Sequence, residues 1–345
     1  MGKIKRITSL AELGKLAGVT AATASRALAD SAEISVKTKE KIKALAKEYN
    51  YTINANARSL RMKKTNAIAV LLNSPDELSG TVSAQPFVSD VIARISDALA
   101  ARGLDMNLSS ERHLGGGCWD QYYLQAKRAD GLIVLGQADN AKRLNELVEL
   151  GTPFVVMGAY SRQRNYCVVG CDGKKSGMVA TNHLIQDCKR KRILFIGPLA
   201  HYETEQRCKG YKKALEEAGM EVNKSLMIEC DHSAEHAQAM LEQQLQEKGL
   251  FFDAVFASSD ELAFGVMQAL TKSNISIPKD VCVMGYDNIR ASKFVTPSLT
   301  TISQNLESIV EHLIDAMLKR IAGETVKSVE IPFELVIRAS TRGSM

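Results

Sequence analysis

Two groups of side chains in this sequence could make specific polar contacts. The first is Thr20-Ala-Ala-Thr-Ala-Ser-Arg26, where one guanidinium and three hydroxyls lie within two turns of an expected helix. An arginine can donate two hydrogen bonds to a guanine edge, hydroxyls suit backbone phosphates, and alanine methyls can touch thymine methyls. The segment therefore predicts a surface that contacts nucleic acid.

The second group follows apolar runs in the later part of the chain. Asp287 comes after Met284-Gly-Tyr286, and Arg207 lies in the first turns of an expected helix. If the apolar runs are parallel strands, their carboxyl ends share one edge of a sheet, where ligands bind. Arginine and aspartate can hold vicinal hydroxyls by charge-assisted hydrogen bonds, so this group predicts a site suited to a sugar.

Three expected helices position the first group. Ser9-Leu-Ala-Glu12 has the spacing of a capping box, in which the serine caps a backbone amide and the glutamate reaches back to the Ser9 amide. Gly18 breaks this first helix, Thr20 caps the second, and Ser35 caps a third. Two short helices joined by a tight glycine-containing turn form a helix-turn-helix. The residues expected to close a small core are Val36, Ile42, Leu45 and Ala46.

The charges of the chain are divided unevenly. Residues 1–65 carry 14 lysines and arginines against 5 acidic residues, net +9, whereas the other 280 residues carry 30 against 34. A basic head on a mildly acidic body is the electrostatic footprint of phosphate neutralisation. The alternative is a solvated helix face, which would account for Lys37, Lys39, Lys41, Lys43 and Lys47.

The sequence resembles the lactose/galactose repressor (LacI/GalR) family over nearly its whole length. The resemblance is carried by Leu10–Val19, Thr20–Arg26, Ile34–Thr38 and Asn54–Leu60. It implies that the second helix enters the major groove of DNA, with Ala21, Ala22 and Arg26 at the base-reading positions. The other DNA-binding residues expected in the head, as caps or phosphate donors, are Ser9, Thr20, Thr23 and Ser25.

A short hinge helix is expected over Asn54 to Arg61. Two turns are too short to be stable alone in water, so the hinge should order only on DNA. The resemblance implies that paired hinge helices of a dimer enter the minor groove, where Leu60 wedges between the central base pairs. The further residues expected at this contact are Asn54, Ala57 and Arg58.

From about residue 66, short apolar runs alternate with amphipathic helices, the pattern of parallel sheets covered on both faces. We expect a helix-turn-helix head at 1–52, a hinge and linker at 53–65, and an α/β body at 66–345 that binds the effector and dimerises. The resemblance implies a periplasmic-binding-protein-like clamshell of two subdomains, completed by segments that cross back. The expected subdomains are 66–166 with 304–328, and 167–303 with 329–345.

The resemblance also implies which residues face an effector in the cleft. They are Arg207, Asp287, Ser259, His232 and Gln304, with Asp172 and Phe87 as further candidates. His232 stands where some relatives have an aromatic residue, and Ser259 where asparagine is frequent. These differences predict an effector that is not simply lactose-like.

The motifs of common enzymes are missing from the sequence, which has no GxxxxGK, GxGxxG or GxSxG. Cys230-Asp-His232 with His236 could hold a metal, but a capped helix start explains the same residues, and we expect no cofactor. There is no secretory segment and no long apolar stretch, and the seven cysteines form no CxxC pair. We therefore expect a cytoplasmic, nucleoid-associated protein without a membrane partner.

These features predict a transcriptional regulator, a repressor of sugar uptake or catabolism genes. It would bind a palindromic operator as a homodimer and respond to a small sugar or sugar phosphate. The alternative is a sugar-binding protein whose head has no specific DNA function; a chromatin-type architectural protein would not need such a body. The chain has no leucine-heptad tail after its last expected strand, which favours a dimer over a tetramer.

Overall fold

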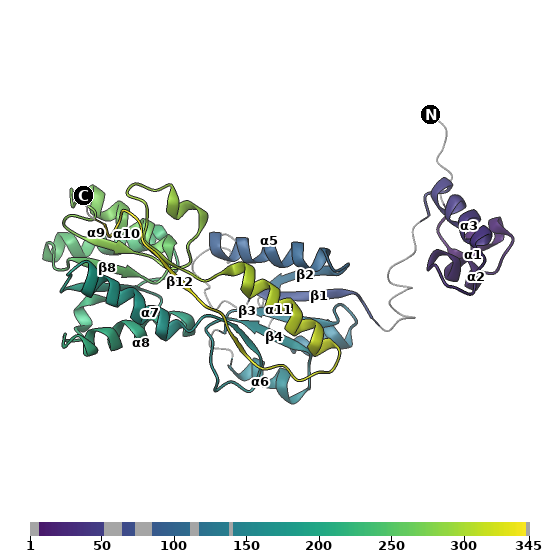
Figure 1. The fold of residues 1–345 in the computed structure, drawn as a ribbon, viewed down its shortest axis with the longest axis horizontal. Coiled ribbons are helices and arrows are strands. Elements are labelled where there is room, and N and C mark those ends of the chain that lie inside the picture. Colours follow the sequence, from purple (N-terminus) through teal and green to yellow (C-terminus); the bar gives the residue numbers. More distant parts are fainter. Residues whose placement is uncertain (1–6, 52–63, 73–84, 111–116, 138–140, 343–345) are drawn as a thin grey trace. The chain divides into compact units, whose positions relative to one another are not determined.

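Three helices form the head of the protein. The computed structural model describes residues 7–51, 64–72, 85–110, 117–137 and 141–342, and it divides into a head that ends at Thr65 and a body that begins at Asn66. The helices of the head are α1 (Leu10–Ala17), α2 (Ala21–Leu28) and α3 (Val36–Glu48) (Figure 1).

A hydroxyl side chain begins each of these helices. Ser9, Thr20 and Ser35 each accept a hydrogen bond from the amide three residues further on, at 3.2, 3.1 and 3.3 Å. The Glu12 carboxylate accepts from the amide of Thr8 at 3.0 Å, so the second half of the predicted capping box is shifted by one residue. Gly18 ends α1 with a φ of 71°, in the left-handed region that favours glycine.

A small apolar core joins the three helices. Ile42 and Ala46 of α3 lie in it as predicted, and Leu45 packs against it. The prediction for Val36 is wrong, since its side chain is 69% exposed. Val36 is six positions before Ile42, which places it about 120° around the helix from the buried face. The remaining buried members of the core are Ile7, Leu13, Ala17, Ala24 and Ala27.

The body alternates strands and helices along most of its length (Figure 1). Its first sheet contains β1 (Ala67–Leu72), β2 (Asp105–Ser110), β3 (Gly131–Leu135), β4 (Phe154–Met157), β5 (Val168–Gly170) and β11 (Val329–Glu330). Its second sheet contains β6 (Ile193–Gly197), β7 (Met227–Glu229), β8 (Ala254–Ala257) and β9 (Cys282–Met284), and a small sheet pairs β10 (Thr301–Ser303) with β12 (Glu334–Val336). The long helices are α5 (Pro86–Ala100), α6 (Ala141–Glu149), α7 (Gly173–Asn182), α8 (Tyr202–Glu217), α9 (Ala234–Lys248), α10 (Asp260–Lys272) and α11 (Leu306–Ile321). The short ones are η3 (Gln121–Gln125), η4 (His183–Asp187), η5 (Lys224–Leu226) and η6 (Arg290–Lys293).

The two larger sheets are parallel and share one local topology. The first has the order β11-β5-β4-β3-β1-β2 and the second the order β7-β6-β8-β9. β1 pairs with both β2 and β3, and β6 pairs in the same way with β7 and β8. This repeat confirms the predicted body of two α/β subdomains.

The chain crosses between the subdomains at points that differ from the predicted ones. The sequence pattern assigns residues 167–170 and 329–330 to the second subdomain, but β5 pairs with β4, and β11 pairs with β5, in the first sheet. An apolar run shows that a strand is buried without showing which strand lies beside it. The run from 329 to 337, predicted as one strand, is divided between β11 and β12, because Pro332 has no amide hydrogen to donate to a continuous ladder.

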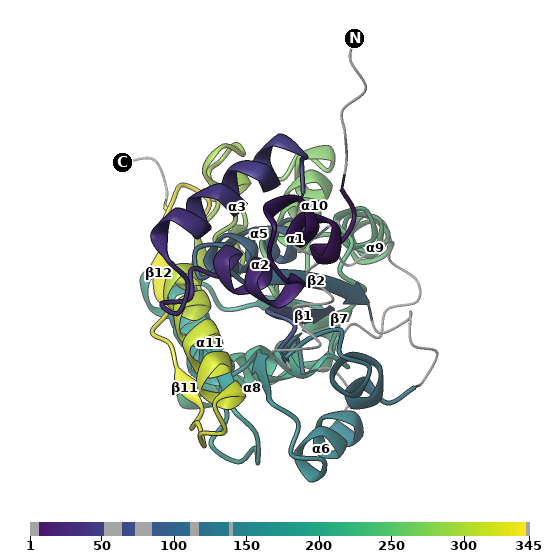
Figure 2. The ribbon, with the colours of Figure 1, turned by 90° about the vertical axis from the view of Figure 1, so that its right-hand side faces the viewer.

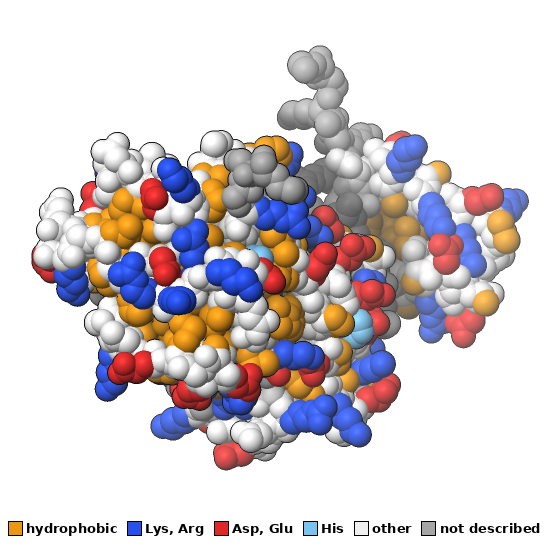
Figure 3. Space-filling model, turned by 60° about the vertical axis from the view of Figure 1, so that its left-hand side comes forward, with side chains coloured by type: hydrophobic (Ala, Val, Ile, Leu, Met, Phe, Trp, Pro, Cys, Tyr) orange, Lys and Arg blue, Asp and Glu red, His pale blue; other side chains and the backbone are white. Residues whose placement is uncertain are grey.

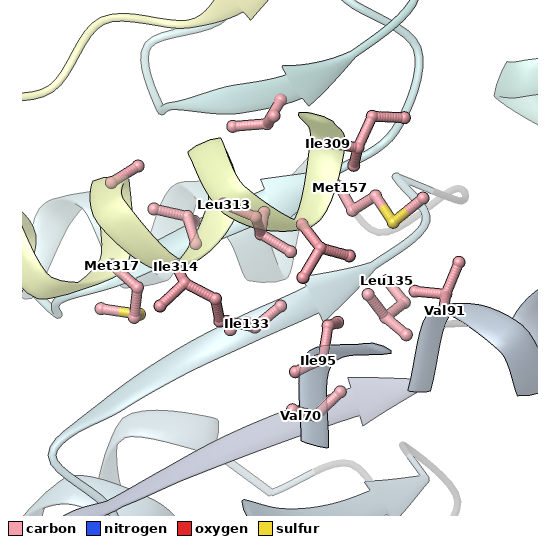
Figure 4. Close-up of a cluster of buried hydrophobic side chains, with 14 of the residues drawn as sticks. Val70, Val91, Ile95, Ile133, Leu135, Met157, Ile309, Leu313, Ile314 and Met317 are labelled. Atoms are coloured by element: carbon pink, nitrogen blue, oxygen red, sulfur yellow. The ribbon is translucent and has the colours of Figure 1, made fainter. Parts of the chain in front are cut away.

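Helices cover both faces of each sheet (Figure 2). In the first subdomain, Ile68 and Val70 of β1 pack with α5 and α11, whereas Ala69 and Leu71 pack with η3 and α6. In the second, α9 and α10 cover one face, and α7 and α8 cover the other. On the face of the body that Figure 3 shows, basic, acidic and apolar side chains are interspersed. Figure 4 shows how far α11 reaches into the first core, where Leu313 and other apolar side chains face the sheet.

Candidate functional site

The exposed face of α2 carries the residues predicted to read bases. Ala21, Ala22 and Arg26 are exposed, whereas Ala24 and Ala27 are buried in the core of the head. Two methyl groups beside one guanidinium form a small surface that can approach base edges closely. Arg26 is the member of this set that can donate hydrogen bonds to a base.

The hydroxyl residues predicted at the DNA contact have roles within the head. Ser9 and Thr20 cap helices, and the Thr20 and Thr23 hydroxyl oxygens lie 2.9 Å apart. Ser25 is half-buried on α2. The contacts of Thr20 and Thr23 fix the start of α2. If these hydroxyls also contact phosphate, they do so in addition to this structural role. The predicted hinge residues Asn54, Ala57, Arg58 and Leu60 lie outside the described residues.

Arg26 forms an exposed ion pair with Glu33. Its Nη1 lies 3.3 Å from Oε2 of Glu33, and the two side chains are 60% and 69% exposed. Exposed pairs of this kind contribute about 0–1 kcal/mol to stability. Arg26 can therefore exchange Glu33 for a base edge at little cost.

Some lysines of the head tie its helices together. Lys41 Nζ donates to the carbonyl of Ala17 at 2.9 Å, and Lys43 Nζ lies 2.6 Å from Oδ1 of Asp30. Lys39 Nζ donates to the carbonyl of Asp30 at 3.1 Å. These lysines connect α3 with the ends of α1 and α2. This structural role differs from both alternatives drawn from the sequence, which are contact with phosphate and a solvated helix face.

A cleft of about 180 Å³ lies at the carboxyl ends of the strands of both parallel sheets. The wall from the first subdomain is mainly apolar and includes Leu72, Phe87, Val91, Leu135, Met157 and Ile309. The wall from the second subdomain is mainly polar and includes His201, Glu203, Arg207, His232, Ser259, Glu261 and Asp287. The cleft can thus hold a ligand with one apolar and one hydrogen-bonding side.

Arg207 of α8 and Asp287, which follows β9, form the charged centre of this cleft. Arg207 Nη2 lies 3.9 Å from Asp287 Oδ1, and the side chains are only 12% and 8% exposed. The guanidinium also donates to the carbonyl of Ser258 and lies over the ring of Tyr286, 3.7 Å from its centroid. From the other side, Gln304 Nε2 donates to Asp287 Oδ1 at 2.6 Å. The structure therefore brings together three of the predicted residues.

Asp287 has a raised pKa and an unusual backbone conformation. Burial raises the pKa of Asp287 to about 7, and the positive charge of Arg207 opposes part of this rise. The backbone of Asp287 has a φ of 111°, which few residues other than glycine adopt. Backbone strain of this kind is concentrated at ligand sites, where the surrounding structure maintains it.

Asp260 maintains the loop that carries Asp287. Its carboxylate accepts hydrogen bonds from the amide of Ile289 at 2.9 Å, from the Ser292 hydroxyl at 2.6 Å and from the Thr301 hydroxyl at 2.5 Å. Burial raises the pKa of Asp260 to about 6. Asp260 is therefore a positioning residue behind the cleft.

Six of the seven predicted effector residues line the cleft, namely Arg207, Asp287, His232, Ser259, Gln304 and Phe87. Ser259 also caps α10, since its hydroxyl accepts from the amide of Leu262 at 3.3 Å. Asp172 is not among the residues that line the cleft. Its carboxylate caps α7 through the amide of Lys175, at 2.9 Å.

His201 and Glu203 line the cleft and do not belong to the predicted set, and the same holds for Gln85, Thr204 and Glu261. The His232 Nε2 and His201 Nδ1 atoms lie 3.1 Å apart. The Glu203 carboxylate accepts from the amide of Gln137, in the first subdomain, at 2.9 Å and so bridges the cleft. Both His201 and Glu203 follow the strand β6, so the strand-end argument applied to Asp287 could have found them.

Among the described residues, no group of three or more His, Cys, Asp or Glu side chains is arranged to hold a metal ion. In the same part of the chain, no helix combines the length and apolarity needed to cross a membrane.

Comparisons with known proteins agree with this arrangement. Residues 9–54 match the bacterial regulatory proteins of the lacI family, and residues 181–341 match a periplasmic binding protein-like domain. The transcriptional regulator CelR of Thermobifida fusca is 29% identical over 348 residues, covering 97% of this chain and 99% of CelR. The transcriptional repressor PurR of Haemophilus influenzae is 28% identical over 344 residues, with the same coverage of each chain.

Solved structures agree as well. The lac repressor dimer bound to operator and the anti-inducer ONPF has a TM-score of 0.86 at 26% identity and covers 98% of this chain and 100% of its own. The complex of CelR with cellobiose has a TM-score of 0.69 at 27% identity and covers 97% and 100%. The chain thus combines a lacI-family DNA-binding domain with a periplasmic-binding-protein-like domain, and it is similar along nearly its whole length to transcriptional regulators that share this arrangement.

Proposed function

We propose that the protein is a cytoplasmic repressor of sugar uptake or catabolism genes, which binds a near-palindromic operator as a homodimer. The proposal is carried by the presence, in one chain, of an exposed arginine on α2 and a buried Arg207 and Asp287 pair in a cleft. The first can contact base edges and the second can bind a small molecule. The solved lac repressor is a dimer on operator DNA, and CelR was solved with cellobiose, which supports both halves of the proposal.

We propose that the effector is a neutral sugar rather than a sugar phosphate. Glu203 and Glu261 bring two carboxyl groups to the cleft in addition to Asp287, whose pKa is about 7, against one arginine that already contacts Asp287 and the carbonyl of Ser258. A phosphate would be repelled by this wall. A sugar can instead place its hydroxyls on the polar wall and the carbon face of its ring on the apolar wall.

The effector would act by shifting the population of body states. It can change the affinity for DNA only by as much as it binds one state of the cleft more tightly than the other. Glu203 bonds to Gln137 across the cleft, so a ligand that contacts both walls would favour the state in which this bond is made.

Selection from a random DNA pool at near-physiological salt, with and without a panel of neutral sugars, tests the proposal. We expect the protein to enrich a palindromic site whose occupancy changes with one sugar. Arg207→Ala should keep the site and lose the response, whereas Arg192→Ala, which removes an exposed charge from the same subdomain, should keep both.

Two results would refute parts of the proposal. Enrichment of no sequence would favour the alternative, a sugar-binding protein without specific DNA function. If occupancy of the DNA site changes only with phosphorylated sugars, the protein would still be a regulator, but its effector would not be a neutral sugar.

A further inference from the structure

A second cavity lies in the first subdomain, outside the effector cleft. Its volume is about 640 Å³, and it lies between the loop that joins β4 to β5 and the segment that follows α11. It shares no described lining residue with the cleft. Whatever this cavity binds would therefore leave the effector site unoccupied.

Positive charge dominates the lining of this cavity. Arg162, Arg164, Arg320 and Lys327 line it, and none of the other described lining residues is an aspartate or glutamate. The face of the body in Figure 3 differs, since acidic and basic side chains are interspersed on it. Four cations around one cavity repel one another unless an anion is present.

The contacts of these cations leave them available to a ligand. Arg162 Nε donates to the hydroxyl of Tyr160 at 3.2 Å, and Arg164 lies over the ring of Tyr202, 4.6 Å from its centroid. Arg320 donates to two backbone carbonyls at 3.4 and 3.5 Å, both near the limit for a hydrogen bond. The carboxylate of Glu330 acts on Arg162 electrostatically, but it forms its contact with Lys175, 3.9 Å away.

A buried hydroxyl in the same lining also lacks a partner. Tyr166 is 8% exposed, and its hydroxyl has no hydrogen-bond partner among the described residues. Burial raises the pKa of Tyr166, so the phenol keeps its proton and can act as a donor. A buried donor without an acceptor is costly, and the oxygen of an anion would satisfy it.

We propose that this cavity binds a small phosphate-bearing molecule, as a second ligand site distinct from the sugar cleft. Guanidinium groups bind phosphate oxygens by paired, charge-assisted hydrogen bonds, which Arg162, Arg164 and Arg320 can supply. Lys327 adds a fourth positive charge, and the Tyr166 hydroxyl adds a neutral donor. The cavity would thus bind an anion, whereas the cleft would bind a neutral ligand.

Calorimetric titration of the full chain with inorganic pyrophosphate, at constant ionic strength, tests the site. Wild-type protein should bind saturably, and the double variant Arg162→Ala/Arg164→Ala should bind at least about tenfold more weakly. The matched control Lys142→Ala/Lys319→Ala removes two exposed charges of the same subdomain that do not line the cavity, and it should bind as wild type does.

Tyr166→Phe keeps the test decisive if the double variant folds poorly. Because the hydroxyl has no partner in the structure, its loss should leave the melting temperature unchanged or higher while pyrophosphate binds roughly fivefold more weakly. Absence of saturable binding to wild type would overturn the proposal. Equal affinity in wild type and both cavity variants would also overturn it, because the anion would then bind elsewhere, such as at the basic head.

Discussion

Replacing Asp287 by asparagine should change how the stability of the body depends on pH. Burial raises the pKa of this carboxyl from 3.8 to about 7. Between these two values the folded protein keeps a proton that the unfolded chain loses, so the free energy of unfolding of the wild type falls as pH rises. Asp287→Asn removes the titrating group and therefore its share of this fall.

The size of the effect follows from the shift in pKa. Each pH unit inside this window changes the free energy of unfolding by about 1.4 kcal/mol, so raising the pH from about 5.5 to about 8 should favour the variant by roughly 2 kcal/mol. The variant also loses the ion pair with Arg207. That pair forms only when the carboxyl is ionised, so its effect is already contained in the pKa of about 7, which Arg207 lowers, and it adds nothing further to the difference.

Urea unfolding, followed by the fluorescence of Trp119, measures this difference. Trp119 is the single tryptophan of the chain and is 2% exposed in the body. Asp97→Asn, which replaces an exposed carboxylate on α5, is the matched control and should show no such change with pH. The reasoning is refuted if Asp287→Asn differs from wild type by the same amount at both pH values, or if it gains relative stability at the lower one.

Four further substitutions test other parts of the structure. Arg26→Ala should relax one operator position by about 1–3 kcal/mol, and an unchanged base-preference profile would contradict base reading. Leu13→Ala should cost the core of the head about 2–5 kcal/mol and abolish operator binding while calorimetry still detects the effector; loss of both would show that head and body fold together. Asp172→Ala should destabilise the body by about 0.5–2 kcal/mol in urea unfolding without weakening the binding of the effector. Weaker binding would show that Asp172 contributes to the effector site. Glu203→Ala should weaken effector binding about fivefold in the same titration because the bond across the cleft to Gln137 is lost, and unchanged affinity would deny that bond a role.

Local signals in the sequence predict the head well. Ser9, Thr20 and Ser35 begin their helices because a hydroxyl that caps a helix acts on an amide three residues away, within reach of a sequence pattern. Val36 fails because its exposure depends on which side of α3 meets the other helices, and this is a tertiary property.

Long-range pairing explains the predictions that fail in the body. The apolar runs predict strands, but the neighbours of β5 and β11 depend on residues far away in the chain. Asp172 is a different case, since it follows a strand as predicted but caps its own helix through the amide of Lys175, a local contact. Glu203 could not be linked to Gln137 from the sequence, because their contact joins two subdomains.

The late position of α11 in the chain affects how the protein can fold during synthesis. β1, β3, β4 and β5 leave the ribosome before the strands β6, β7, β8 and β9 of the second sheet, and α11 follows only after them. Until then, the face of the first sheet that Leu313, Ile314 and Met317 cover is covered by α5 but not by α11. The second subdomain can therefore complete its parallel sheet first, while a nascent chain that stops before Leu306 presents an apolar surface to chaperones and to other unfinished chains.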